Sequence, residues 1–203
     1  MEERKLNEKE SLELITQMIQ NSKKNLQLGD GNIFLLWGYL SSITALVVFA
    51  LVKISGDPIW NIVWFAIPAI GWPVMYLQKK KEAKPVLTYT DKTLTSLWAI
   101  IGQYGMGISI LCCMYYDTLP LLPSIILILC SMSVALSAKI IDDKFMANCS
   151  GAGLAIGVVS LSQVFNPPIY DMQYIGFALA MFIMMVLPGH RLNKEAKRLC
   201  SKN

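Results

Sequence analysis

Two adjacent carboxylates are the residues of this chain best suited to chemistry. Asp142 and Asp143 stand between Lys139 and Lys144, and Asn148 follows shortly after them. A carboxylate pair could bind a divalent cation through its oxygen atoms, or it could share one proton. The same residues also suit a solvated loop, where each charge is hydrated. Both interpretations stay open at the level of the sequence.

His190 is the single histidine of the chain, and it follows Pro188 and Gly189 beside Arg191. A zinc site needs several converging ligands, and a catalytic triad needs a nucleophile and an orienting acid. Neither set of partners accompanies His190. We interpret it as an anchor at the level of lipid headgroups or as a cation at a helix end.

Uncharged polar residues also interrupt long apolar stretches. Gln103 stands beside Tyr104 in one stretch, and Gln163 lies towards the end of another. Polar groups inside a bilayer are costly and therefore usually have a role. An interhelical hydrogen bond explains each glutamine more simply than ligand binding does. The five cysteines have no CxxC spacing and are expected to be small apolar filler.

The elements that must position these residues are six uncharged apolar stretches. Each has about the 20 residues that a helix needs to cross roughly 30 Å of hydrocarbon. The chain has 203 residues, and 54% of them are apolar. The sequence therefore predicts an all-α membrane protein in which a six-helix bundle occupies residues 31–190. The expected helices are 33–53, 59–77, 95–116, 119–138, 147–165 and 172–189.

The basic residues orient these helices. Of the 18 Lys and Arg residues, 17 fall on the side of the two termini, and only Lys53 falls on the other side. Cytoplasmic loops of membrane proteins carry such an excess. We expect a multipass protein of a bacterial inner membrane with both termini in the cytoplasm. Residues 191–203 would then form a basic cytoplasmic tail.

Glycine spacing suggests how the helices pack. Gly153 and Gly157 are four residues apart in the fifth stretch, with Gly151 close by. Such spacing places small side chains on one helix face and lets a neighbouring helix approach closely. This pattern predicts that the fifth helix is the central one.

Residues 1–30 form a separate cytoplasmic segment. Leu12, Ile15 and Ile19 recur at helical spacing, which predicts an amphipathic helix, and Gly29 and Gly31 are expected to break it before the membrane. The lipid interface, the bundle or another protein could cover the apolar stripe. The polar face lacks basic residues along its middle, which favours protein contact. The bundle or a second copy ranks ahead of a soluble partner.

The chain resembles a family of small, functionally uncharacterised bacterial multipass membrane proteins. The resemblance rests on three groups of residues at the two ends of the chain. They are Glu10-Ser11-Leu12 with Ile15 and Met18-Ile19, then Leu36-Trp37-Gly38-Tyr39, and finally Pro188-Gly189-His190. The resemblance implies at most a membrane-linked regulatory or stress role, and it assigns no activity to any residue.

The sequence thus favours a non-enzymatic sensory, regulatory or scaffold protein without a cofactor. Its expected partners are the lipid bilayer and either a second copy or a cytoplasmic protein, and no nucleic acid. A small-molecule binding or transport subunit is the alternative. An intramembrane enzyme is the weakest interpretation, because Asp142, Asp143 and His190 are the only residues suited to it.

Overall fold

The computed structural model describes residues 8–81, 89–164 and 170–200, and no strand occurs among them. The helices run in the order α1 (Glu8–Ser55), η1 (Pro58–Phe65), α2 (Ala66–Lys81), α3 (Tyr89–Met114), η2 (Tyr116–Leu121), α4 (Leu122–Ile141), α5 (Lys144–Val164), α6 (Tyr170–Met181), η3 (Phe182–Val186) and α7 (Leu187–Cys200). η1 and η2 are 3-10 helices, and η3 is a π-helical turn.

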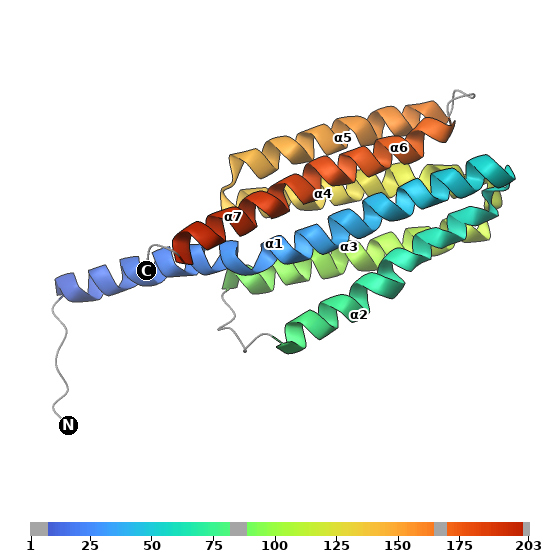
Figure 1. Cartoon of the computed structure of the whole chain (residues 1–203). Coiled ribbons are helices and arrows are strands. Elements are labelled where there is room, and N and C mark those ends of the chain that lie inside the picture. The colour runs from blue at the N-terminus through green and yellow to red at the C-terminus, as the bar shows by residue number, and fades with distance from the viewer. Residues whose placement is uncertain (1–7, 82–88, 165–169, 201–203) are drawn as a thin grey trace.

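Six helical segments of the described chain are long and apolar enough to span a membrane, as predicted. They are Gly31–Ser55, Ile59–Gln78, Lys92–Met114, Thr118–Ile141, Lys144–Ser162 and Met172–Glu195. The segments run side by side as an elongated bundle (Figure 1). The connections α1–η1, α3–η2 and α4–α5 are only a few residues long, so consecutive segments lie antiparallel.

Local chemistry explains the turn between the first two segments. α1 ends at Ser55 and is followed by Gly56, whose φ of 70° is costly for residues that carry a Cβ atom. The backbone N–H of Gly56 donates to the carbonyl of Val52 at 2.8 Å. Asp57 then caps η1, because its Oδ1 accepts from the N–H of Ile59 at 2.9 Å, and Pro58 occupies the first helical position.

The first helix corrects the expected boundary at residue 30. α1 runs without interruption for 48 residues, so Gly29 and Gly31 do not break it. A glycine inside a helix costs only about 1 kcal/mol, which packing can offset. A Cβ at Gly31 would overlap the side chain of Asn193 and lie 3.0 Å from the carbonyl oxygen of Gly189. Gly31 therefore serves the close approach of α7 rather than a turn.

The central helices differ from those expected. Within an apolar window of 18 residues, 61% of the residues are buried in the sixth segment, against 33% in the fifth. α1 lies along α6, η3 and α7, while one side of α5 remains exposed at Leu154, Val158 and Val159. The prediction that the fifth helix is central is wrong. Spaced glycines make one face of a helix close-packed, and they do not decide how many neighbours surround it.

Gly153 and Gly157 nevertheless lie at helix contacts. A Cβ at Gly157 would be 3.0 Å from Ile128 of α4, and a Cβ at Gly153 would be 2.8 Å from the sulfur of Met184 in η3. Both glycines are buried. Two different neighbours thus approach α5 at successive turns of one helix face.

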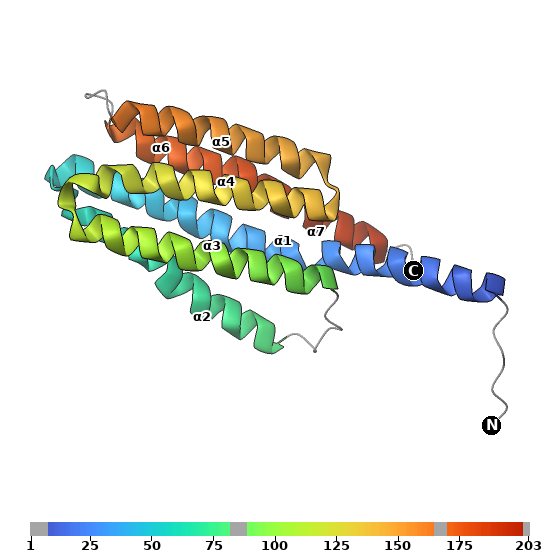
Figure 2. The ribbon, with the colours of Figure 1, turned by 180° about the vertical axis from the view of Figure 1, so that it is seen from behind.

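Two further features shape the molecule. α2 diverges from the other helices towards its C-terminal end, as both views show (Figures 1 and 2), and it carries exposed Trp72 and Tyr76. The chain beyond Arg191 does not leave the bundle as a separate tail, since the helix continues as α7 to Cys200. The N-terminal part of α1 projects past the same end of the bundle.

Candidate functional site

The two predicted carboxylates lie at the turn that joins α4 to α5. Asp142 ends α4 in the left-handed conformation, with φ of 62°, and its N–H donates to the carbonyl of Ala138. Asp143 begins α5. Its Oδ1 accepts from the backbone N–H of Phe145 at 2.8 Å and from that of Met146 at 3.2 Å. This is the geometry of a helix N-cap, and a negative charge there also complements the helix dipole.

Arg191 of α7 joins this turn from a position 48 residues later in the chain. Its NH1 group lies 3.3 Å from Oδ1 of Asp143, and its Nε donates to Oε1 of Glu195 at 3.0 Å. The guanidinium carbon also lies 4.9 Å from the centre of the Phe145 ring, in a cation–π contact. Because the Arg191 side chain is 42% exposed, each ion pair contributes at most about 1 kcal/mol.

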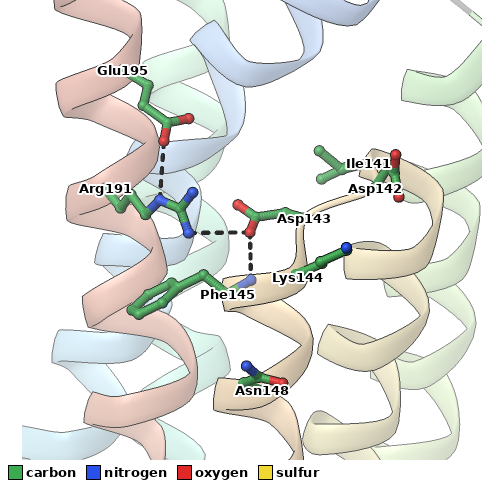
Figure 3. Close-up of a pocket in the computed structure, with 8 residues that line it drawn as sticks. All are labelled: Ile141, Asp142, Asp143, Lys144, Phe145, Asn148, Arg191 and Glu195. Carbon is green, nitrogen blue, oxygen red and sulfur yellow. Dashed lines mark hydrogen bonds and ion pairs between the residues drawn. The ribbon is translucent and has the colours of Figure 1, made fainter.

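These residues border an open pocket of about 510 Å³ at the end of the bundle (Figure 3). α4, α5 and α7 all contribute to its wall. The lining residues are Ile141, Asp142, Asp143, Lys144, Phe145, Asn148, Arg191 and Glu195. The pocket therefore offers both signs of charge beside an aromatic ring, which suits a small polar or zwitterionic molecule better than an apolar one.

The geometry does not favour the paired-carboxylate interpretation. Asp143 points towards Arg191, whereas Asp142 points away from that pair (Figure 3). Within residues 8–81, 89–164 and 170–200, no group of three His, Cys, Asp or Glu side chains is placed to hold a metal ion. Asp143 organises the start of α5 and pairs with α7, and a cation would have to compete with Arg191 for it.

His190 lies near this site but contacts a different helix. Its Nε2 is 2.7 Å from the phenolic oxygen of Tyr39 in α1, and the two rings meet edge to face with centroids 5.9 Å apart. Which of the two groups donates depends on the histidine tautomer. One turn further along, Nδ2 of Asn193 donates to Oδ1 of Asn32 at 2.8 Å. α7 is thus connected to α1 by these bonds and to the α4–α5 turn by Arg191.

The interhelical hydrogen bond predicted for Gln103 is not made among the described residues of this chain. Gln103 and Tyr104 lie on the exposed side of α3, where 67% of the Tyr104 side chain is accessible. α3 is the least buried segment, because its described neighbours are mainly α4 and η2. Neither residue belongs to the pocket. The side chain of Gln163 lies outside the described residues, as do those of Ile15 and Ile19.

The sequence analysis missed a buried polar contact at the opposite end of the bundle. Oδ1 of Asn61 accepts from the indole N–H of Trp64 and from the hydroxyl of Tyr174, both at 3.1 Å. Trp64 and Tyr174 would suit a membrane-interface belt, but both are buried and stack on each other. The available signal was Asn61 itself, an amide three residues before a tryptophan in an apolar stretch.

Comparison with protein families, with curated proteins and with solved structures finds no match for this chain. The fold of the described residues places the chain in the class of all-helical proteins with six segments long and apolar enough to span a membrane.

Proposed function

We propose that this chain is a multipass protein of a bacterial inner membrane, with both termini in the cytoplasm and a non-enzymatic sensory, regulatory or scaffold role. The observation that carries the proposal is the unbroken helix α1. At 1.5 Å per residue its 48 residues extend about 72 Å, more than twice the roughly 30 Å of hydrocarbon. The residues before Gly31 therefore continue past the apolar segment as a helical stalk, residues 8–30, and the first part of this stalk projects beyond the bundle (Figure 1).

A continuous helix is suited to carry a displacement from the bundle to the cytoplasm. Any rotation or shift of the segment Gly31–Ser55 moves the stalk with it, because no turn intervenes. α7 lies against the base of the stalk through Gly31 and Gly189, and Arg191 connects α7 to the α4–α5 turn. The pocket at this turn is a place where a small ligand would act on the same unit.

The distribution of charge supports the orientation. The described basic side chains at the end where α1 and α7 project are Lys92, Lys139, Lys144, Arg191, Lys194 and Arg198. Lys53 is the described basic side chain at the opposite end. A bilayer with a cytoplasm on the positive side is the arrangement that the positive-inside rule favours.

Small-molecule binding or transport is the second candidate, and the pocket of about 510 Å³ favours it. Transport also needs a path between the helices. In the described bundle the interior is filled by side chains such as Leu127, Met184 and Phe177, each at most 1% exposed. The pocket therefore fits a regulatory ligand at one end of the bundle better than a translocation pathway.

Cysteine accessibility tests the orientation. In a background without native cysteines, a membrane-impermeant thiol reagent applied to intact spheroplasts should modify Gly56→Cys and leave Ala83→Cys unmodified. Inside-out vesicles should reverse the result. The opposite pattern would place the stalk on the outer side and overturn the proposal.

Purification from native membranes tests the role. The full chain should retain a cytoplasmic protein that a chain lacking residues 1–28 loses. If both forms instead retain the same small molecule and no protein depends on the deletion, binding or transport replaces the regulatory role.

A further inference from the structure

We infer that the stalk pairs with the stalk of a second copy of this chain, as a parallel coiled coil that continues the exposed face of α1. The inference rests on the proposed placement of the stalk outside the bilayer, and it names the partner that the proposed function leaves open. A sequence repeat of seven residues along α1 and the burial of its described side chains carry the argument.

The repeat is regular along the whole of α1. Counting by sevens from Leu12 gives an unbroken series of apolar residues at the first heptad position, position a. The series is Leu12, Ile19, Leu26, Ile33, Leu40, Val47 and Ile54. The fourth position, d, holds Ile15, Leu36, Ile43 and Ala50, with small Ser22 and Gly29 between them. Apolar a and d positions over several heptads are the pattern of a coiled coil.

The described part of this face is exposed at Leu12 and along the second half of the membrane segment, while Ile33, Leu36 and Leu40 are partly buried. None of the described side chains at positions a and d is buried, and Leu12 in the stalk is 64% exposed. The opposite face is the one that packs. Position f holds Gly31, Gly38 and Ala45, all buried against α6, η3 and α7. α1 thus packs on its own bundle through a face that combines these small residues with Phe34 and Val48, and its a and d positions lie mainly outside this contact.

The part of this face that lies in the stalk matters most, because outside the bilayer its apolar side chains would be exposed to water. Within the bilayer, lipid can cover exposed Ile43 or Val47 without cost. Beyond it, the apolar stripe that contains Leu12 would contact water, which is unfavourable. The bundle does not reach Leu12, because the first part of the stalk projects past it (Figures 1 and 2). In the proposed membrane placement the stalk leads away from the membrane surface, because α1 continues without a break out of its membrane segment.

A second copy fits the face better than an unrelated helix for two reasons. Two copies inserted in one membrane hold their stalks at the same depth and in the same direction, so the heptads align in register without further selection. The charges also permit the pairing. The e and g positions that would meet are Ser11 with Thr16, Met18 with Lys23, and Asn25 with Asp30, and none of these pairs has like charges.

Cysteine cross-linking along the stalk tests the inference. In the full chain without native cysteines, single cysteines at Leu12, Ile15, Ile19 and Leu26 should form disulfide-linked dimers in membranes. Cysteines at Glu13, Gln17, Gln20 and Lys24 should form far fewer. A yield that repeats every three to four residues supports the coiled coil. A flat profile, or links to another protein in place of the dimer, would overturn it.

Two matched variants of the native chain make the test independent of the cysteine background. Ile15→Asp with Ile19→Asp places two charges in the seam, and Gln17→Asp with Gln20→Asp places the same two charges on the polar face. Only the first should weaken dimerisation, by about a hundredfold or more, as measured by native mass spectrometry over a concentration series. Equal dimer fractions for the two variants at each concentration, or a parent chain that is monomeric, would refute the pairing.

Reagent accessibility of Gln17→Cys from the cytoplasmic side separates the two proposals. A correctly oriented stalk that does not dimerise leaves the proposed function in place and removes only the second copy.

Discussion

Gly38 offers a sharp test of how α1 packs on η3. A Cβ at this position would lie 2.8 Å from Cγ2 of Val186, 2.9 Å from Cβ of Met185 and 3.2 Å from the backbone nitrogen of Val186. Carbon atoms prefer about 3.5–4.0 Å. Two of these three atoms cannot rotate away, since one is a backbone atom and another is bonded directly to the backbone. Gly38→Ala therefore forces α1 and η3 apart.

The matched control is Gly107→Ala in α3, where no described atom lies within 4 Å of the added Cβ. Both substitutions gain up to about 1 kcal/mol of helix propensity, so the difference between them isolates the overlap. Overpacking costs about 1–3 kcal/mol. For a chain of this size that difference corresponds to melting temperatures about 2–12 °C apart. Gly107→Ala should be neutral or stabilising, and Gly38→Ala should melt at the lower temperature.

The assay is thermal unfolding in one detergent, followed by tryptophan fluorescence and by loss of monodispersity on size-exclusion chromatography. Gly153→Ala provides an internal gradation. Its closest neighbour is the flexible sulfur of Met184 at 2.8 Å, which can move aside, so its effect should fall between the other two. Equal melting temperatures for Gly38→Ala and Gly107→Ala would show that α1 does not approach η3 this closely.

Three further experiments test other contacts. Gly157→Leu should lower the melting temperature, because the added side chain would overlap α4. Its control is Gly151→Leu on the open side of the same helix, which should leave the melting temperature within about 2 °C. A shift of equal size in both variants would contradict the assigned face of α5. Asp143→Ala should lower the free energy of unfolding by about 0.5–2 kcal/mol, because the N-cap of α5 is lost. Arg191→Gln should lower it by less, because the ion pairs of Arg191 are partly exposed. The reverse order in chemical denaturation would show that the ion pair matters more than the cap. Gln103→Leu should be neutral or stabilising, because the side chain lies on the exposed face of α3, and a clear loss of thermal stability would reveal a partner on that face.

The candidate site could be predicted only in part. Asp142 and Asp143 were recognisable because adjacent carboxylates are a local feature of the sequence. Their chemistry was not, since the partner of Asp143 is Arg191, which belongs to a helix that begins more than 40 residues later. His190 was likewise recognised as the single histidine, and only the packing of α1 on α7 brings it to Tyr39.

The sequence by itself determined the number of apolar segments and the end at which their positive charges gather. Both properties depend on local length and composition, so no knowledge of contacts is required. Only the tertiary structure decided which sides of the helices are covered. It turned Trp64 and Tyr174 inward and left Gln103 outside.

The tertiary structure also decided that α1 is continuous. Read alone, Gly29 and Gly31 indicate a break, since glycine weakens a helix. In the fold, the missing side chain of Gly31 is what allows α7 to approach, and that contact accompanies an uninterrupted helix. A glycine's role follows from what lies opposite it, and the residues opposite Gly31 are more than 150 positions away in the chain.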